Sequence, residues 1–191
     1  MHTNELVTLR EVGLRDGLQS IARTLPTVTK LEWLRGAHAT GLREIELGSF
    51  VPARLLPQLA DTAELVTVAN TLPGLLGSVL VPNLKGAERA LQCGAHAMLL
   101  PLSASHAHSL ANLRKTPDDV LLEIAAIAQR RDAWAAETGQ RCLLEVGLST
   151  AFGCTLQGRV DEAQVLRLLQ AAVAAGADCV GLADTVGYAD P

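Results

Sequence analysis

The residues best suited to chemistry in this sequence follow short apolar runs at intervals along the chain. In chain order they are Arg15 and Asp16, Glu46 and Ser49, Asn83 and Lys85, Ser103 and Ser105, Ser149, and Asp184 and Thr185. A guanidinium group stabilises negative charge that develops on an oxygen atom, and carboxylates transfer protons or bind a divalent cation. If these side chains meet in space, they could stabilise an oxyanion, transfer protons or bind a divalent cation.

The apolar runs that precede these residues alternate with amphipathic stretches. We predict strands at 6–12, 42–47, 77–81, 97–102, 142–147 and 177–183, and helices at 27–39, 52–66, 85–92, 117–138 and 160–175. Capping signals support the helices: Thr27 and Thr116 stand at two starts, Pro117 follows Thr116, and glycines follow four of the ends. Regular alternation of strand and helix predicts a parallel sheet with right-handed crossovers.

The positions of the polar residues favour a barrel over an open sheet. A TIM barrel distributes its chemistry over successive loops at the carboxyl ends of its strands, whereas an open doubly wound sheet concentrates it at one switch point. A closed barrel needs eight βα units and typically about 250 residues, while this chain of 191 residues offers about six. The predicted fold is therefore α/β, a (β/α)8 TIM barrel of which about six units are present. We expect residues 1–191 to form a single incomplete domain that lacks the C-terminal units.

Composition excludes several other classes of protein. Hydrophobic residues make up 49% of the chain, which argues against disorder, and the net charge of −4 without a long basic run argues against nucleic-acid binding. No apolar run approaches the roughly 18 residues of a membrane span, and the N-terminus lacks a secretory signal. Four cysteines without a C-x-x-C pair indicate a reducing, cytoplasmic location. Whether the protein assembles into a homodimer is left open.

Several segments resemble one enzyme family in the same order along the chain. Residues 11–19 (EVGLRDGLQ) resemble the signature after the first strand of 3-hydroxy-3-methylglutaryl-CoA (HMG-CoA) lyases, and further similar segments lie at 44–52, 57–61, 82–86, 152–158 and 182–187. The Arg-Asp-Gly element is shared with the wider group of Claisen-type enzymes, such as isopropylmalate and homocitrate synthases and the carboxyltransferase domain of pyruvate carboxylase. Leu18 resembles the lyases, because the synthases usually carry Glu there.

The resemblance implies a metal-dependent carbon–carbon lyase. Such an enzyme cleaves HMG-CoA, or a related 3-hydroxy-3-alkylglutaryl-CoA, to acetyl-CoA and a 3-oxo acid with Mg²⁺ or Mn²⁺ as cofactor. Asp16 is then a metal ligand, and Arg15 stabilises the carbonyl and enolate oxygen. The alternative for this pair is a solvated ion pair that closes a turn at Gly17.

Two further carboxylates are expected to handle protons. Glu46 alternates with Ile45 and Leu47, so it can face the inside of a barrel, although an ion pair with Arg43 or with a basic residue of another strand is an alternative. Asp184 joins it as a catalytic residue, and a role as helix N-cap is compatible with this.

The remaining candidates are substrate-binding residues. Gln19 and Ser49 can position substrate oxygens, with a turn or capping role as the alternative. Asn83 and Lys85 stand where a CoA phosphate or pantetheine would pass, although a surface lysine is an ordinary helix start. His106 is expected to contact substrate or CoA, with simple solvation as the alternative. The family commonly carries an acidic residue at that position, and its paired histidine ligands come from a strand beyond Asp184.

Two other functions remain open at this stage. The first is a Claisen-type acyltransferase, which would condense an acyl-CoA with a 2-oxo acid, and Leu18 speaks against it. The second is an inactive barrel fragment that binds a partner, because the remaining metal ligands and the catalytic cysteine of the family would lie downstream. We expect the 191-residue piece alone to be inactive.

Overall fold

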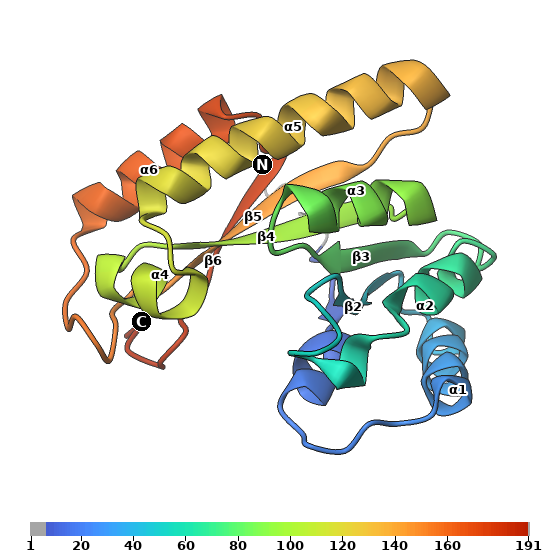
Figure 1. The fold of residues 1–191 in the computed structure, drawn as a ribbon. Coiled ribbons are helices and arrows are strands. Elements are labelled where there is room, and N and C mark those ends of the chain that lie inside the picture. The colour runs from blue at the N-terminus through green and yellow to red at the C-terminus, as the bar shows by residue number, and fades with distance from the viewer. Residues whose placement is uncertain (1–6, 191) are drawn as a thin grey trace, which may run out of the picture.

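The computed structural model describes residues 7–190 and contains one sheet of six parallel strands (Figure 1). The strands are β1 (Arg10–Glu11), β2 (Glu44–Ser49), β3 (Leu76–Leu80), β4 (Ala97–Ser103), β5 (Leu143–Ser149) and β6 (Cys179–Leu182). They lie in the order β1 to β6, each paired in parallel with the next. An unbroken sequential order is that of a TIM barrel and differs from the reversed order of a doubly wound sheet. The predicted fold class is confirmed.

Helical segments connect the strands. They are the π-helical turn η1 (Gly13–Gly17), α1 (Thr27–Ala39), the 3₁₀ turn η2 (Pro57–Leu59), α2 (Thr62–Ala69), α3 (Leu84–Cys93), α4 (His106–Leu113), α5 (Pro117–Thr138) and α6 (Glu162–Ala174). Helices α3, α5 and α6 run along the same face of the sheet (Figure 1). The other face is left for the inside of the curl.

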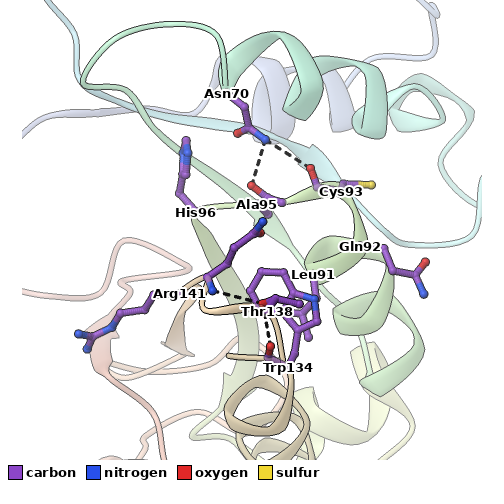
Figure 2. Close-up of a pocket in the computed structure, with 11 residues that line it drawn as sticks. Asn70, Leu91, Gln92, Cys93, Ala95, His96, Trp134, Thr138 and Arg141 are labelled. Carbon is purple, nitrogen blue, oxygen red and sulfur yellow. Dashed lines mark hydrogen bonds between the residues drawn. The ribbon is translucent and has the colours of Figure 1, made fainter. Parts of the chain in front are cut away.

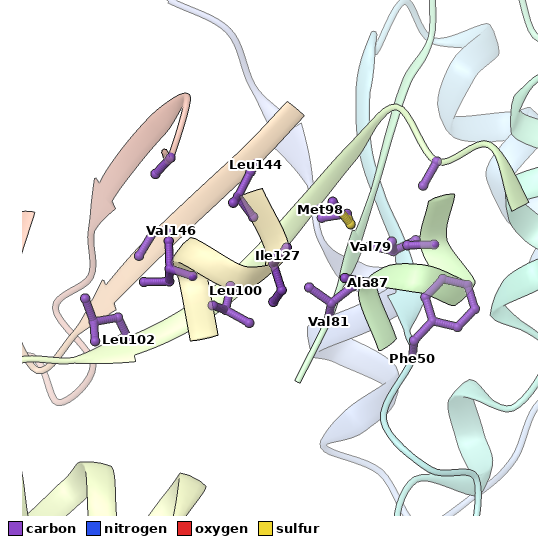
Figure 3. Packing of buried hydrophobic residues seen from close by; sticks show 14 of the residues in the cluster. Phe50, Val79, Val81, Ala87, Met98, Leu100, Leu102, Ile127, Leu144 and Val146 are labelled. Carbon is purple, nitrogen blue, oxygen red and sulfur yellow. The ribbon is translucent and has the colours of Figure 1, made fainter. Parts of the chain in front are cut away.

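Side-chain alternation divides the two faces. In β5, Leu144, Val146 and Leu148 are fully buried, and the intervening residues are only half-buried. The buried residues pair in register with their counterparts in β4, and Ile127 of α5 packs over them (Figure 3). Because successive strand residues point to opposite faces, Glu145, Gly147 and Ser149 face the inside of the curl.

An ion-pair network on the inner face reaches from β1 to β5. The Arg10 guanidinium lies 3.2 Å (Nε) from Glu44 Oε2 of the neighbouring strand and 2.8 Å (Nη2) from Glu145 Oε2. Strands β1 and β5 are separated in the sheet by three others, so a direct contact between them requires the sheet to curl. The six strands therefore form part of a barrel wall with a polar interior at this level.

Most predicted element boundaries agree with the structure to within two residues, and three differ in type or extent. Residues 52–66 are not one helix, because Pro57 starts a separate 3₁₀ turn and α2 begins only at Thr62. The first strand is reduced to Arg10–Glu11, with its predicted start at residue 6 outside the described residues. Helix α4 was not predicted.

One predicted helix cap is wrong, and one predicted helix start is displaced. Thr27 is the first residue of α1 and not its cap, and its hydroxyl donates to Asp61 Oδ2 at 2.8 Å. Helix α6 starts at Glu162, where Asp161 caps it by accepting from Ala163 N. Thr116 caps α5 in a full capping box with Asp119, as its sequence indicated.

Among residues 7–190, no helix combines the length and the apolar character needed to cross a bilayer.

Replacing Arg10 tests the network between β1 and β5. Arg10→Met leaves Glu44 and Glu145 without their counter-ion, and we expect the free energy of unfolding to fall by about 1 kcal/mol, since the three side chains are partly exposed. Urea denaturation measures the change. The double variant Arg10→Met/Glu145→Gln should recover part of the loss, and strictly additive effects would contradict a direct contact.

Candidate functional site

Arg15, which follows β1, and Glu46, which lies in β2, form an ion pair. Arg15 Nε lies 2.7 Å from Glu46 Oε1, and Arg15 Nη2 lies 3.1 Å from Glu46 Oε2. The guanidinium therefore donates two parallel hydrogen bonds to the carboxylate. A third hydrogen bond of 2.8 Å joins Arg15 Nη1 to Asp16 Oδ1. Of the two ion-pair partners foreseen as alternatives for Glu46, Arg43 is wrong, because its guanidinium donates to backbone carbonyls of His38 and Leu42. The base comes instead from the turn after another strand, as the second alternative stated.

The π-helical turn η1 brings Arg15 to this position. The amides of Arg15, Asp16 and Gly17 all donate to Val12 O, which reverses the chain directly after β1. Leu14, within the same turn, is fully buried and anchors it in the core. The Arg15 side chain is only 15% exposed, so the alternative of a solvated loop pair is wrong for Arg15.

Glu46 is the most deeply buried carboxylate of the site, with 1% of its surface exposed. Burial raises the pKa of Glu46, and the hydrogen bonds and charge of Arg15, with the charge of Arg10, only partly offset this. A carboxylate with a raised pKa accepts a proton more readily than a solvated one. The prediction that Glu46 faces the barrel interior is confirmed by its burial and its contact with Arg15.

Asp16 lies at the surface, with 62% of its side chain exposed. Its Oδ1 accepts from Arg15, and its other oxygen is available to a cation. Within residues 7–190, no three His, Cys, Asp or Glu side chains come together in a way that could hold a metal ion. Asp16 therefore offers one oxygen ligand, and the described residues alone do not complete a metal site.

Asp184 is committed to the backbone near the end of the chain. Its carboxylate is exposed and accepts from the amides of Tyr188 (2.9 Å) and Ala189 (3.1 Å). These hydrogen bonds lower the pKa of Asp184. The carboxylate closes a turn, since residues 183–190 contain no helix, and both the N-cap role and the role in proton transfer stay predictions.

The five predicted substrate-binding residues differ in their surroundings. Ser49 is buried and its Oγ accepts from Val51 N at 3.1 Å, and Asn83 Oδ1 caps α3 by accepting from Gly86 N at 3.0 Å. Gln19, Lys85 and His106 are exposed. Ser49 therefore has the turn role named as its alternative, the helix cap at Asn83 was not foreseen, and contact with substrate stays a prediction for all five.

A second polar cluster lies at the ends of β4 and β5. The sequence placed Ser103, Ser105 and Ser149 at strand ends, but it did not indicate that His108 and Thr150 join them. Ser103 Oγ lies 2.7 Å from His108 Nδ1, and 3.2 Å from both Thr150 Oγ1 and Ser149 Oγ. Ser105 caps α4 by accepting from His108 N at 3.1 Å. The spacing of a capping serine three residues before a histidine could have indicated that His108 turns back toward the strand end.

Thr150 fixes the backbone of this cluster. It is fully buried and has a φ of 57°, which is unusual for a β-branched residue. Its Oγ1 accepts from Ser105 N at 3.0 Å and donates to Ser149 O at 2.6 Å, and its own amide donates to Thr185 Oγ1 at 2.8 Å. Strained residues of this kind persist where their surroundings over-determine them.

A hollow at the opposite end of the sheet is separate from both groups. It is lined by residues near the starts of β4 and β5, including Asn70, His96 and Trp134 (Figure 2). His96 Nδ1 accepts from Gly77 N at 2.9 Å, and burial lowers the pKa of its ring. This end of a TIM barrel generally serves stability, and no predicted site residue lines the hollow.

Comparison with known proteins gives a consistent family. A family model described as HMGL-like matches residues 6–191. The hydroxymethylglutaryl-CoA lyase YngG of Bacillus subtilis is 35% identical over 97% of this chain, and the (R)-citramalyl-CoA lyase of Chloroflexus aurantiacus is 34% identical over 98%. The chain spans 60% of the length of each enzyme.

A solved structure shows the same fold. The HMG-CoA lyase of Acinetobacter baumannii, in complex with coenzyme A and 3-methylmalate, has a TM-score of 0.85 and 34% sequence identity. The match covers 97% of this chain and 59% of that one.

The hydroxyl of Thr150 should contribute to stability through its buried hydrogen bonds. Thr150→Val leaves Ser105 N without an acceptor, and we expect a loss of about 1–3 kcal/mol in the free energy of unfolding. Thr150→Ser retains the hydroxyl and should lie close to the parent protein. Thermal or urea unfolding compares the two variants, and equal losses would show that the hydroxyl is not what matters.

Proposed function

Because the chain belongs to the HMGL-like family, we propose that the protein is a carbon–carbon lyase acting on an acyl-CoA. Its substrate is HMG-CoA or a related 3-hydroxy-3-alkylglutaryl-CoA, and its products are acetyl-CoA and a 3-oxo acid. The observation that carries the proposal is the buried Glu46 carboxylate held by two hydrogen bonds from Arg15.

The reaction requires removal of the C3 hydroxyl proton, stabilisation of the enolate, and protonation of the enolate at C2. Glu46 and Arg15 suit the first two of these tasks. Glu46 accepts the proton of the C3 hydroxyl, because its raised pKa makes it a stronger base than a solvated carboxylate. The C3–O electrons then form a carbonyl, the C2–C3 bond breaks, and its electron pair delocalises into the thioester as an enolate. A proton from solvent then adds at C2 to complete acetyl-CoA, and Glu46 releases its own proton to solvent.

Arg15 stabilises the enolate oxygen. A guanidinium has five N–H donors, and the contacts to Glu46 and Asp16 occupy three of them. The remaining two can donate to the thioester oxygen as negative charge develops there. Because Arg15 is clamped by two carboxylates, it is already oriented before substrate binds.

We further propose that Asp16 supplies one ligand to a Mg²⁺ or Mn²⁺ ion. Such an ion, when bound, would lower the pKa of the substrate hydroxyl and neutralise charge beside it. The exposed position of the Asp16 carboxylate supports this, and the described residues provide no complete ligand set. A cytoplasmic location and homodimeric assembly stay predictions from the sequence.

The Claisen-type alternative is less compatible with the packing. Leu18, at the position where synthases usually carry Glu, is 3% exposed and belongs to the core cluster. A glutamate there would be taken out of water, at a large cost unless paired.

The proposal is tested by incubating the intact protein with HMG-CoA and Mg²⁺ or Mn²⁺ and measuring acetyl-CoA. We expect Arg15→Gln and Glu46→Gln each to lower kcat by about 10²- to 10³-fold. Arg141→Gln is a control, because Arg141 precedes β5 at the opposite end of the strands and is 82% exposed. Release of free CoA thiol from an acyl-CoA and a 2-oxo acid, with no cleavage of HMG-CoA, would favour the synthase instead.

A further inference from the structure

We propose that His108 contacts the acyl-CoA substrate through an Nε2–H donor, with Ser103 as the residue that positions its ring. This assignment rests on the proposed function, because it adds a substrate contact to the same edge of the barrel. It also selects one of the two histidines of the segment His106-Ala-His108.

The backbone directs His108 toward the strand ends. Ser105 is the N-cap of α4, and His108 is the third residue of that helix. The Ser105 Oγ accepts from His108 N, which fixes the first turn, and the imidazole lies back against Ser103, the last residue of β4. His106 is the first residue of α4 and is exposed, whereas His108 is half-buried and anchored.

Ser103 lies on the inner face of the barrel wall. It pairs in register with Ser149 at the end of β5, and the preceding pair, Leu102 and Leu148, is fully buried on the helix-covered face. The loops after β1 and β2, which carry Arg15 and follow Glu46, lie at the same carboxyl edge because all six strands are parallel. The His108 ring, hydrogen-bonded to Ser103, therefore lies at the edge of the barrel that carries the proposed site.

The hydrogen bonds around Ser103 favour one tautomer of His108. Thr150 Oγ1 uses its single proton on Ser149 O at 2.6 Å, and Ser149 Oγ donates to Leu102 O or to Ser103 Oγ. Ser103 Oγ then has two acceptors for its proton, Thr150 Oγ1 at 3.2 Å and His108 Nδ1 at 2.7 Å, and we assign the proton to the shorter contact. A neutral imidazole that accepts at Nδ1 carries its hydrogen at Nε2.

Nε2–H is consequently a donor in both charge states of the ring. If His108 is protonated, Ser103 Oγ accepts from Nδ1 and Nε2 still donates. Within residues 7–190, no protein acceptor contacts Nε2. An oriented donor without a protein partner suits an oxygen of the ligand. In an acyl-CoA such oxygens belong either to the acyl group, as its carboxylate, or to the CoA moiety, as the amide carbonyls of the pantetheine arm and the phosphates.

The experiment measures binding and turnover separately in the intact protein. Calorimetric titration with free CoA and with HMG-CoA gives Kd, and acetyl-CoA release gives KM and kcat. We expect His108→Leu to raise Kd or KM about tenfold, the effect of one lost hydrogen bond, with kcat within about twofold. His108→Gln, which restores an N–H donor, should recover part of the affinity, and Ser103→Ala should show a smaller loss of about threefold because the ring remains but is no longer held.

The two ligands identify the contact. Weaker binding of HMG-CoA alone places the acyl group at His108, and equal weakening for CoA and HMG-CoA places the CoA moiety there. Unchanged Kd for both ligands in a His108→Leu protein with parental unfolding temperature overturns the proposal, as does a larger effect from His106→Leu. Failure of the parent to cleave HMG-CoA would overturn the lyase function, while CoA titration would still test His108.

Discussion

A carboxylate removed from water loses its hydration, and this loss must be offset by other hydrogen bonds or charges. For Glu46, which points inward from β2, Arg15 provides both. Glu46 is 1% exposed, and both of its oxygens accept hydrogen bonds from one guanidinium. This contact requires the parallel pairing of β1 with β2, which places the two strands in register, and the tight turn η1, which folds the chain back directly after β1. Without that turn, Glu46 would be an unpaired buried charge.

The same sheet geometry assembles the second polar cluster. Parallel pairing of β4 with β5 over seven residue pairs ends at Ser103 and Ser149, so that side chains from two loops meet. At this junction the hydrogen bonds of the Thr150 hydroxyl and amide stabilise its backbone at a positive φ. One edge of the barrel wall therefore carries an ionic group and a hydroxyl–imidazole group, both positioned by strand ends, which is the support that the proposed site requires.

Sequence patterns predicted the elements well because apolar periodicity and capping residues are local signals. The orientation of Glu46 was predictable for the same reason, since alternation along a strand is local. Its partner was not, because the choice of Arg15 over Arg43 depends on the register between β1 and β2 and on a turn with π-helical hydrogen bonds. Residues 52–66 were wrongly predicted as one helix. The Thr62 hydroxyl contacts Leu59 O and Ser49 O and so fixes the later start of α2, and the contact with Ser49 is not visible in the local sequence. The sequence analysis named His106 and not His108 as a substrate-binding residue, because the contact of His108 with Ser103 appears only when α4 folds against β4.

The titration of Glu46 tests the central claim most directly. In the intact protein with ¹³C-labelled glutamate, the Glu46 carboxyl resonance, assigned with Glu46→Gln, is followed by NMR as pH is varied. We predict a pKa above the ordinary glutamate range, and a further rise in Arg15→Gln, because the guanidinium stabilises the charged form while burial opposes it. A pKa within or below the ordinary range that does not respond to Arg15→Gln would show a solvated carboxylate, and would contradict the account.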